Sequence, residues 1–312
     1  MKTIGIGMSH AKIILIGEHS VVYGQPAIAL PLPNVNLKVS IQITGNNSRR
    51  LIHSRYFDGP IEQLPPKMAG IKQLITTLID RFHGQRDSWA MTIDSQLPAE
   101  RGMGSSAASA IAIVRAFFDL YQQSLDRELL LKLADIEEQI THRSPSGLDA
   151  ATCSSNQPIW FIKGQAGTTF DMHLAATMVI ADTGKTGATK AAIMAVRQLL
   201  KKRPDQAKGH IEHLGQLTKQ AQANLRLNQP SQLGHVLTES QSDLRALNVS
   251  DQSLDHLIQI ALDNDALGAK LTGGGRGGCM FAITANKAKA RQLAKTLEDN
   301  GARRTWLQPM NG

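Results

Sequence analysis

The hydrophobic pattern of the first half of the chain predicts strands and helices in a mixed order. Alternating or short continuous apolar runs predict strands at residues 12–16, 21–23, 35–43, 89–93 and 159–162. Apolar residues at helical spacing predict helices at residues 71–79, 105–118 and 129–140. Glycine, proline and polar residues predict turns at residues 17–19, 45–48 and 144–147, and a loop at residues 97–104.

The second half of the chain has fewer strand patterns than helical ones, which predicts an α+β domain. The expected elements are a strand at 177–181, helices at 191–200 and 254–262, a strand, glycine loop and strand across 267–283, and a terminal helix at 285–300. A chain of 312 residues favours two domains over one. We place their boundary after residue 165, which gives domains 1–165 and 166–312.

Composition excludes several classes of protein. Hydrophobic residues make up 42% and charged residues 19%, with no apolar run long enough to cross a membrane. His10, Lys12 and Glu18 interrupt the N-terminal apolar stretch before a signal-peptide core could form. Cys153 and Cys279 lie far apart in sequence, which favours two free thiols in a reducing compartment. We therefore expect a cytoplasmic protein.

The formal net charge of +8 is compatible with nucleic acid, an anionic membrane surface or anionic small substrates. The lysines and arginines are spread along the chain, and no arginine-rich run or basic motif with interleaved aromatic residues occurs. This distribution argues against nucleic acid as the partner and leaves small anionic substrates open.

A glycine-containing loop leads directly into a predicted helix at residues 102–108, Gly-Met-Gly-Ser-Ser-Ala-Ala. Free backbone N–H groups and the positive end of a helix dipole favour phosphate at such a place. The alternative is a tight turn with Ser105 or Ser106 as the helix N-cap. No Walker sequence or dinucleotide-binding fingerprint is present, so any nucleotide would be held by another device.

A second glycine-rich segment spans residues 270–279 and contains five glycines between two predicted strands. Glycines permit positive φ angles and close approach of the backbone to a ligand. The alternative is a flexible hairpin loop, whose ordering would cost conformational entropy. A bound substrate could offset that cost.

Charged residues recur beside two other predicted turns. Glu137 and Glu138 precede the turn at 144–147 and Asp149 follows it, so one carboxylate could bind Mg²⁺ and another could act on a hydroxyl. A solvated helix face and a cap are the alternatives for these acids. Lys12, Glu18 and His19 stand in an otherwise apolar region, where charged groups need partners.

Taken in order, these four segments resemble the signature motifs and catalytic Asp of the GHMP kinases, named for galactokinase, homoserine, mevalonate and phosphomevalonate kinases. The segment Gly17-Glu18-His19-Ser20-Val21-Val22-Tyr23-Gly24-Gln25-Pro26-Ala27 is similar to the first motif of mevalonate kinases, whereas galactokinases continue from Glu-His into Asp-Tyr. The loop at 270–279 also resembles the mevalonate kinase form of the third motif.

The resemblance implies a ribosomal-protein-S5-like N-terminal domain and a ferredoxin-like C-terminal domain, with ATP and substrate in the cleft between them. It also implies ATP-dependent and Mg²⁺-dependent phosphorylation of the C5 hydroxyl of (R)-mevalonate to 5-phosphomevalonate, a step of isoprenoid biosynthesis. Such an enzyme acts on small molecules, with no nucleic-acid or membrane partner, and a homodimer is left open.

The resemblance also assigns roles to residues. The ATP phosphates would be held by Gly102, Met103, Gly104, Ser105, Ser106 and Ala107. Ser106 and Glu138 would hold Mg²⁺, Asp149 would be the catalytic base, and Lys12 would pair with Asp149. Mevalonate would lie beside Glu18, His19, Thr272 and Gly274. The chain departs from the family pattern at Met103, where Leu is common, and at Arg143, where Gly is common.

Three alternatives stay open from the sequence. The first is another GHMP kinase, such as phosphomevalonate kinase, because these kinases share their ATP machinery. The second is a noncatalytic member that senses nucleotide, although the presence of Lys12, Glu138 and Asp149 favours an active enzyme. The third is a nucleic-acid-binding module, because S5-like folds also occur in translation proteins.

Overall fold

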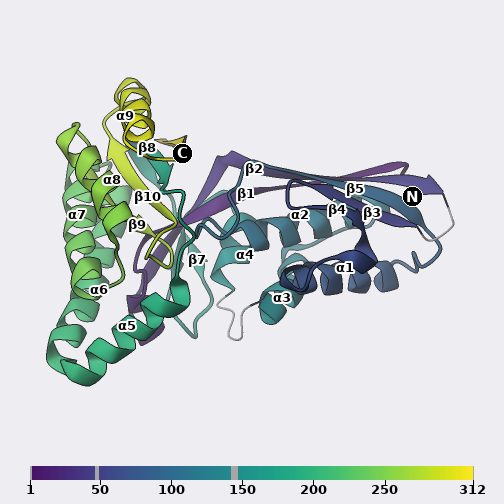
Figure 1. Ribbon diagram of the computed structural model, residues 1–312, viewed down its shortest axis with the longest axis horizontal. Coiled ribbons are helices and arrows are strands. Elements are labelled where there is room, and N and C mark those ends of the chain that lie inside the picture. The colour runs from purple at the N-terminus through teal and green to yellow at the C-terminus, as the bar shows by residue number, and fades with distance from the viewer. Residues whose placement is uncertain (1, 46–48, 142–146, 312) are drawn as a thin grey trace. The chain divides into compact units, whose positions relative to one another are not determined.

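A computed structural model describes residues 2–45, 49–141 and 147–311 (Figure 1). The described residues form two compact units. Unit 1 contains residues 1–11, 35–99 and 104–155, and unit 2 contains residues 12–34, 100–103 and 156–312. This division differs from a single cut after residue 165, because two long N-terminal strands contribute residues to both units. These strands are β1 (Ile4–Ile16) and β2 (Ala27–Gly45).

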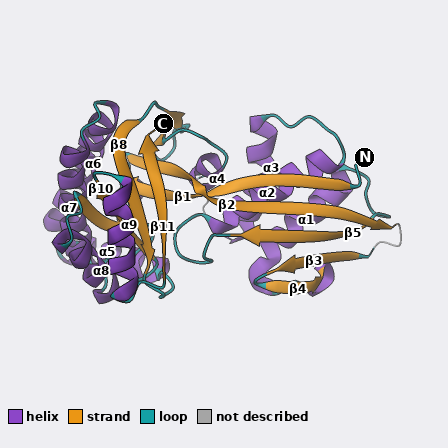
Figure 2. Ribbon diagram, turned by 90° about the horizontal axis from the view of Figure 1, so that it is seen from above, coloured by secondary structure: helices purple, strands orange, loops and turns teal. Residues whose placement is uncertain are grey.

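Unit 1 combines strands with helices that cover one of their faces (Figures 1 and 2). Besides β1 and β2, its strands are β3 (Arg50–Ser54), β4 (Phe57–Pro60) and β5 (Ser88–Ser95). Its helices are α1 (Ala69–Arg81), α2 (Ser105–Leu120), α3 (Arg127–Thr141) and α4 (Leu148–Cys153), with short 3₁₀ turns η2 (Ile61–Gln63) and η3 (Pro66–Met68). Strand β5 pairs antiparallel with β2 and parallel with β3.

Helix α2 is buried along most of its length because it packs closely against β1. A Cβ atom on Gly7 would lie only 2.0 Å from the carbonyl oxygen of Ala112, so only glycine permits this approach. The ring of Trp89 in β5 packs edge-on against Phe117 of α2, with ring centroids 5.9 Å apart. The start of α2, which carries the glycine-loop hydroxyls, is therefore fixed by the core of unit 1.

Unit 2 contains a four-stranded antiparallel sheet with strand order β11-β8-β10-β9 in the described part of the chain. These strands are β8 (His173–Asp182), β9 (Gly268–Thr272), β10 (Cys279–Thr284) and β11 (Arg304–Asn311). The helices are α5 (Thr189–Lys202), α6 (Pro204–Arg226), α7 (Pro230–Ala246), α8 (Gln252–Asp263) and α9 (Lys287–Asp299). Shorter elements are η1 (Ser20–Tyr23), β6 (Ile159–Phe161) and β7 (Thr168–Thr169), and β6 pairs with β2.

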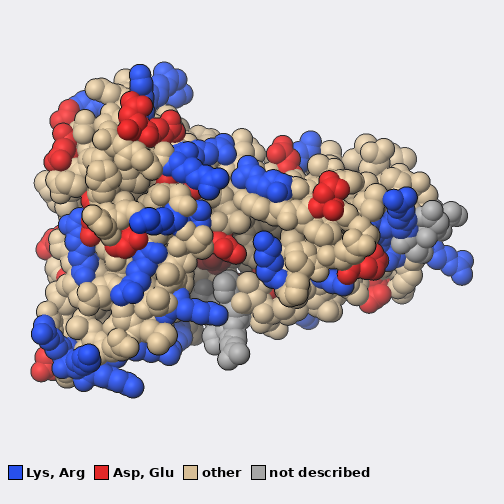
Figure 3. All heavy atoms as spheres, in the orientation of Figure 1, with Lys and Arg blue, Asp and Glu red and all other residues tan. Residues whose placement is uncertain are grey.

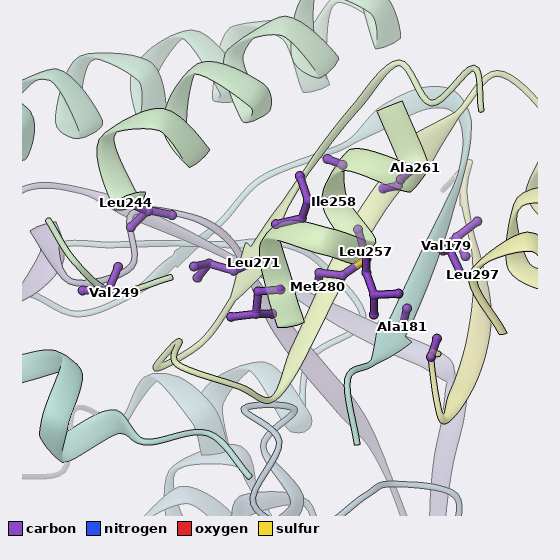
Figure 4. Close-up of a cluster of buried hydrophobic side chains, with 14 of the residues drawn as sticks. Val179, Ala181, Leu244, Val249, Leu257, Ile258, Ala261, Leu271, Met280 and Leu297 are labelled. Carbon is purple, nitrogen blue, oxygen red and sulfur yellow. The ribbon is translucent and has the colours of Figure 1, made fainter. Parts of the chain in front are cut away.

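The main core of unit 2 lies between the helices and one face of this sheet (Figure 4). Alternate strand residues such as Ala181, Leu271 and Met280 point into it, together with Leu257 of α8 and Leu297 of α9. Because side chains alternate along a strand, the residues between them point to the opposite face. Among those on the opposite face are Lys270, Thr272 and Phe281, all of them buried.

Most sequence-based elements are confirmed. The predicted helices coincide with α1, α2, α3, α5, α8 and α9, and the predicted strands coincide with parts of β1, β2, β5, β6, β8, β9 and β10. The strand predicted at 21–23 is wrong, because η1 occupies that segment. Strand β11 follows the helix predicted to be terminal. Residues 46–48 and 142–146, including Arg143 and most of two predicted turns, lie outside the described residues.

Candidate active site

The candidate site residues belong to both units. Unit 1 contains the start of α2, the end of α3 and helix α4. Unit 2 contains the Lys12 strand, the Glu18–His19 turn, the loop before α2 and the glycine loop between β9 and β10. The predicted pairing of Lys12 with Asp149 involves both units and stays a prediction.

The N-terminus of α2 has the features of an anion site. Gly104 is its N-cap residue, with a left-handed φ of 73°, and no described side chain caps the helix. The first intrahelical hydrogen bond is donated by the Ala108 amide to the Gly104 carbonyl, at 2.9 Å. Ser105 and Ser106 are therefore not caps here, and the backbone amides before Ala108 are available to bind an anion at the positive end of the helix dipole.

Two adjacent glutamates at the end of α3 are buried beside the start of α2. The Ser106 hydroxyl donates a hydrogen bond to Glu137 Oε1, and the Thr141 hydroxyl donates to the same oxygen at 2.6 Å. The second oxygen of Glu137 is buried and has no hydrogen-bond partner among the described residues. Glu138, the predicted metal ligand, is also buried. Glu137, the neighbour of the predicted metal ligand, therefore contacts Ser106. The sequence could not show which of the two glutamates makes this contact.

These oxygen donors fit a magnesium ion. Mg²⁺ prefers carboxylate and hydroxyl oxygens and commonly takes only one or two protein carboxylates, with water and substrate phosphates completing its coordination. Two buried carboxylates and a hydroxyl match that preference, and the unpartnered Glu137 oxygen calls for a positive charge. The described residues contain no group of three or more His, Cys, Asp or Glu arranged to hold a metal by themselves.

Asp149 is the second residue of α4 and is partly buried. The Thr152 hydroxyl donates to the Leu148 carbonyl at 2.7 Å, and the Cys153 thiol lies 3.7 Å from the Gly104 carbonyl. Four residues of the helix are buried, namely Leu148, Ala150, Thr152 and Cys153. The short helix carrying the predicted base is therefore anchored to the beginning of α2.

In unit 2, hydrogen bonds bring three of the sequence motifs together. The backbone amide of buried Lys12 donates to the Met103 carbonyl at 3.0 Å. The Thr272 hydroxyl accepts from the Ile14 amide at 3.1 Å and donates to the Ile14 carbonyl at 2.8 Å. This hydroxyl thus holds β1, and its predicted contact with substrate stays a prediction.

The two glycine loops approach each other within unit 2. A Cβ atom on Gly273 would lie 3.1 Å from the Cα of Gly102, so side chains would separate the two backbones at this point. Gly102 has a positive φ of 79° and Gly273 has the same value. Cβ atoms on Gly275, Gly277 and Gly278 would also lie 2.1, 2.7 and 3.1 Å from backbone oxygens, so these glycines serve close backbone packing, which a freely flexible hairpin would not need.

Glu18 forms a fully buried ion pair with Lys270. The sequence did not predict this pairing. Lys270 Nζ lies 2.5 Å from Glu18 Oε1, 2.6 Å from the Leu271 carbonyl and 5.3 Å from the ring centre of Phe281. Burial raises the pKa of Glu18 and lowers the pKa of Lys270, and their mutual attraction opposes both shifts. The pair joins the first motif to β9.

His19 adopts a backbone conformation that is unusual for a residue other than glycine, with φ 61° and ψ −45°. Its Nε2 lies 3.1 Å from the Gly274 carbonyl, so the neutral ring donates a proton from that nitrogen. Strained conformations of this kind are concentrated at functional sites. Two residues predicted to lie beside the substrate, His19 and Gly274, are thus in direct contact.

The buried position of His19 predicts a specific pH dependence of stability. Burial lowers the pKa of His19 from 6.5 to about 4, with the charge of Lys270 adding to the shift. Between these values the unfolded chain binds a proton that the folded protein does not bind. The free energy of unfolding is therefore expected to fall by up to about 3 kcal/mol as the pH decreases across this window.

Denaturant unfolding of wild-type protein and His19→Gln at several pH values between 4 and 7 measures this contribution. The variant should show a smaller decrease in unfolding free energy toward low pH, and identical pH dependence of the two proteins would contradict the burial of a neutral histidine. His10, whose pKa burial also lowers, is present in both proteins and cancels in the comparison.

Arg101 was missed by the sequence analysis, although it immediately precedes Gly102. Its guanidinium group donates to Asp182 at 2.9 Å, to the Thr186 hydroxyl at 2.9 Å and to the Gly184 carbonyl at 3.1 Å. Both charged side chains of the pair are nearly buried. Three directed bonds of this kind fix the start of the glycine loop. An isolated arginine carries no spacing pattern by which it could have been found.

The surface of the molecule does not show one dominant basic patch on the face drawn in Figure 3. Lysine and arginine side chains are scattered over both units, with acidic side chains between them. Neither cysteine forms a disulfide in the described part of the chain, and both are buried. The helices described include none that is long and apolar enough to span a bilayer.

The family models that match the chain agree with this arrangement of motifs. The model for the GHMP kinases N terminal domain matches residues 70–157, and the model for the GHMP kinases C terminal domain matches residues 221–303. The chain belongs to the GHMP kinase family, which confirms the α+β fold and the family resemblance. It is an ATP-dependent kinase that acts on an alcohol.

Several of the proteins similar to this chain are mevalonate kinases. A mevalonate kinase of Pyrococcus horikoshii is 30% identical over 310 residues, covering 93% of this chain and 91% of the relative. The crystal structure of mevalonate kinase from methicillin-resistant Staphylococcus aureus is 34% identical, with a TM-score of 0.79 and full coverage of both chains. L. major mevalonate kinase in complex with R-mevalonate is 24% identical, with a TM-score of 0.87 over 100% and 99% of the two chains.

Proposed function

We propose that this kinase transfers the γ-phosphoryl group of ATP to the C5 hydroxyl of (R)-mevalonate. The observation that carries the proposal is the similarity of the whole chain to mevalonate kinases, at 34% identity for the structure from S. aureus. The Val21-Val22-Tyr23-Gly24 continuation of the first motif supports the same substrate. The product, 5-phosphomevalonate, would serve isoprenoid biosynthesis.

The open N-terminus of α2 supports the proposed phosphate-binding role of the loop from Gly102 to Ala107. Backbone amides aimed at the phosphates neutralise their charge without side-chain rearrangement. Lys12 would add positive charge at the transferred group. In-line phosphoryl transfer depends mainly on such positioning and charge neutralisation, so these groups supply the main requirements of the step.

Ser106 and Glu138 are the proposed magnesium ligands, and Glu137 would hold the Ser106 hydroxyl in place. A bound Mg²⁺ ion would neutralise charge on the β- and γ-phosphates. Asp149 is the proposed base, which accepts the proton of the C5 hydroxyl as the oxygen attacks phosphorus. On the acceptor side we assign His19 and Gly274 to mevalonate binding, with Glu18 and Thr272 supporting the same pocket.

The substrate assignment is tested by measuring ADP release with ATP, Mg²⁺ and one acceptor at a time. The acceptors are mevalonate, phosphomevalonate, galactose and homoserine, with EDTA as the control for metal dependence. Turnover with mevalonate alone supports the proposal. Turnover with phosphomevalonate instead keeps the family and rejects the substrate, and silence with every acceptor favours a noncatalytic nucleotide sensor.

The same proposal places the enzyme in the cytoplasm, acting on small molecules with no nucleic-acid or membrane partner. Two buried cysteines outside any disulfide support a reducing compartment. Light scattering coupled to size exclusion decides whether a homodimer forms, and salt-sensitive retention on RNA would contradict the absence of a nucleic-acid partner.

A further inference from the structure

Two arginines of unit 1 converge on the C-terminal end of α4, the helix that carries Asp149. Arg127 donates from Nη2 to the Ala151 carbonyl at 3.1 Å. Its Nη1 lies 3.4 Å from the Ser154 carbonyl and 3.3 Å from the Ser154 hydroxyl. The guanidinium group therefore spans the last turn of the helix.

Arg115 of α2 reaches the same place from another side. Its Nη2 lies 3.5 Å from the Ser154 carbonyl, and its Nη1 donates to the Met8 carbonyl of β1 at 2.6 Å. The Ser9 hydroxyl donates to the Cys153 carbonyl at 3.0 Å. The end of α4 is thus tied to β1, α2 and α3 by side-chain donors.

A helix of this length needs such donors. The last carbonyl groups of any helix lack intrahelical partners and carry the negative end of its dipole, so cations and N–H groups stabilise them. α4 has six residues, and helices so short are unstable on their own. Its orientation, and with it the direction of the Asp149 side chain, must therefore come from its neighbours.

The charge of each arginine is unfavourable at its own position. Arg127 is the first residue of α3, and a cation at a helix N-terminus is unfavourable. Burial, followed by the like charge of Arg127, lowers the pKa of Arg115. Both costs are offset at the carbonyl end of α4, which is the feature that the two guanidinium groups share.

We propose that Arg115 and Arg127 are positioning residues for phosphoryl transfer, which hold α4 so that the Asp149 carboxylate keeps the orientation it needs toward the acceptor hydroxyl. The inference rests on the proposed role of Asp149 as the base. It adds two residues outside the family motifs to the machinery of the reaction.

Arg127→Ala is the first test, because Arg127 is exposed and its loss leaves no cavity in the core. We expect kcat per folded molecule to fall about tenfold or more, because small displacements of a catalytic group are costly, while KM for ATP and acceptor changes by less than about twofold. Arg127→Lys keeps the charge but not the planar fork and should give an intermediate kcat. Lys132→Ala, an exposed cation on the same helix, is the matched control and should retain the wild-type kcat.

Chemical rescue separates positioning from a general loss of stability. A cavity of about 480 Å³ lies beside Arg115, Arg127 and Ser154, so a guanidinium ion from solution can reach the place that the truncated side chain leaves. Low concentrations of guanidinium chloride should raise kcat of Arg127→Ala several-fold and leave wild type unchanged. Equal stimulation by sodium chloride, or an unchanged kcat in Arg127→Ala without any addition, would overturn the proposal.

The double variant Arg127→Ala/Asp149→Asn shows whether Arg127 acts through Asp149. If it does, Arg127→Ala should lower kcat much less in the Asp149→Asn background than in wild type. Equal fold-losses in both backgrounds would place Arg127 elsewhere in the mechanism. If the acceptor panel selects an alcohol other than mevalonate, the same variants are measured with that alcohol, so failure of the substrate assignment is distinguished from failure of this inference.

Discussion

Asp149→Asn is expected to lower kcat by about 10²–10⁴-fold, the contribution typical of a positioned general base. Asparagine has nearly the same size and shape as aspartate, so the substitution removes the proton acceptor and leaves the packing of α4 in place. Because the base acts only as the hydroxyl attacks, the loss should fall on kcat and leave KM for both substrates nearly unchanged. Steady-state kinetics with mevalonate and ATP measures both quantities.

Two controls make that result specific. Asp135→Asn changes another partly buried aspartate of unit 1 and should keep kcat within about twofold of wild type. Calorimetric titration with a nonhydrolysable ATP analogue should give equal affinity for Asp149→Asn and wild type, because the proposed phosphate contacts lie in the loop from Gly102 to Ala107. Near-normal turnover by Asp149→Asn would remove the base assignment, while a parallel loss of nucleotide binding would indicate a wider disturbance of the site.

Local sequence patterns predicted helices and strands whose formation depends mainly on residues near one another in the sequence. Helix α2 was predicted because small and apolar residues directly follow a glycine loop, and most of these residues are buried in the folded protein. The strand predicted at 21–23 failed for an equally local reason. The positive φ angles of His19 and Gly24 bend the backbone on both sides of Val-Val-Tyr and override its β propensity.

Strand β11 shows how a weak pattern can conceal a strand. Its sequence contains Pro309, which cannot donate to a strand ladder and is normally confined to edge strands. β11 is in fact the first strand in the order β11-β8-β10-β9, so the proline is tolerated there. The sequence could not reveal this position, because it depends on which strand pairs with β8.

The sequence motifs identified residues of the candidate site, but they did not show which of these residues contact one another. Ser106 and the Glu137-Glu138 pair were recognised, but only the fold shows that the Ser106 hydroxyl meets Glu137. Adjacent residues of a helix point about 100° apart, and both of these glutamates are buried, so the sequence cannot choose between them. Pairs of residues far apart in sequence are harder still to predict. Lys270 and Glu18, for example, are separated by 252 positions.

The largest effect on stability is expected from Lys270→Met, which should lower the free energy of unfolding by about 3–5 kcal/mol. The substitution leaves the Glu18 carboxylate buried without its cation, 1% exposed in the folded protein. It also removes the donor to the Leu271 carbonyl and the cationic contact with the ring of Phe281. Equilibrium unfolding in urea measures the loss.

Removal of both the Glu18 and Lys270 charges should lower the free energy of unfolding far less than removal of the Lys270 charge alone. Burial penalises each ion separately, so Glu18→Gln/Lys270→Met avoids the unpaired charge and should recover a large part of the stability lost in Lys270→Met. Lys289→Met is the matched control. Lys289 pairs with Asp265 at 3.1 Å, but the two side chains are 49% and 80% exposed, and such surface pairs contribute about 0–1 kcal/mol.

The same variants show whether the buried pair also serves the site. Glu18 precedes His19, whose strained backbone and contact with Gly274 depend on where this turn is held. If the pair only stabilises the fold, the double variant should regain stability and normal KM for mevalonate together. If the pair also fixes His19, the double variant should regain stability while KM for mevalonate stays raised and KM for ATP stays normal. We expect the second outcome, because Lys270 and Glu18 connect β9 to the turn that carries His19. Glutamine and methionine at these two positions cannot form the charged hydrogen bond that holds this turn.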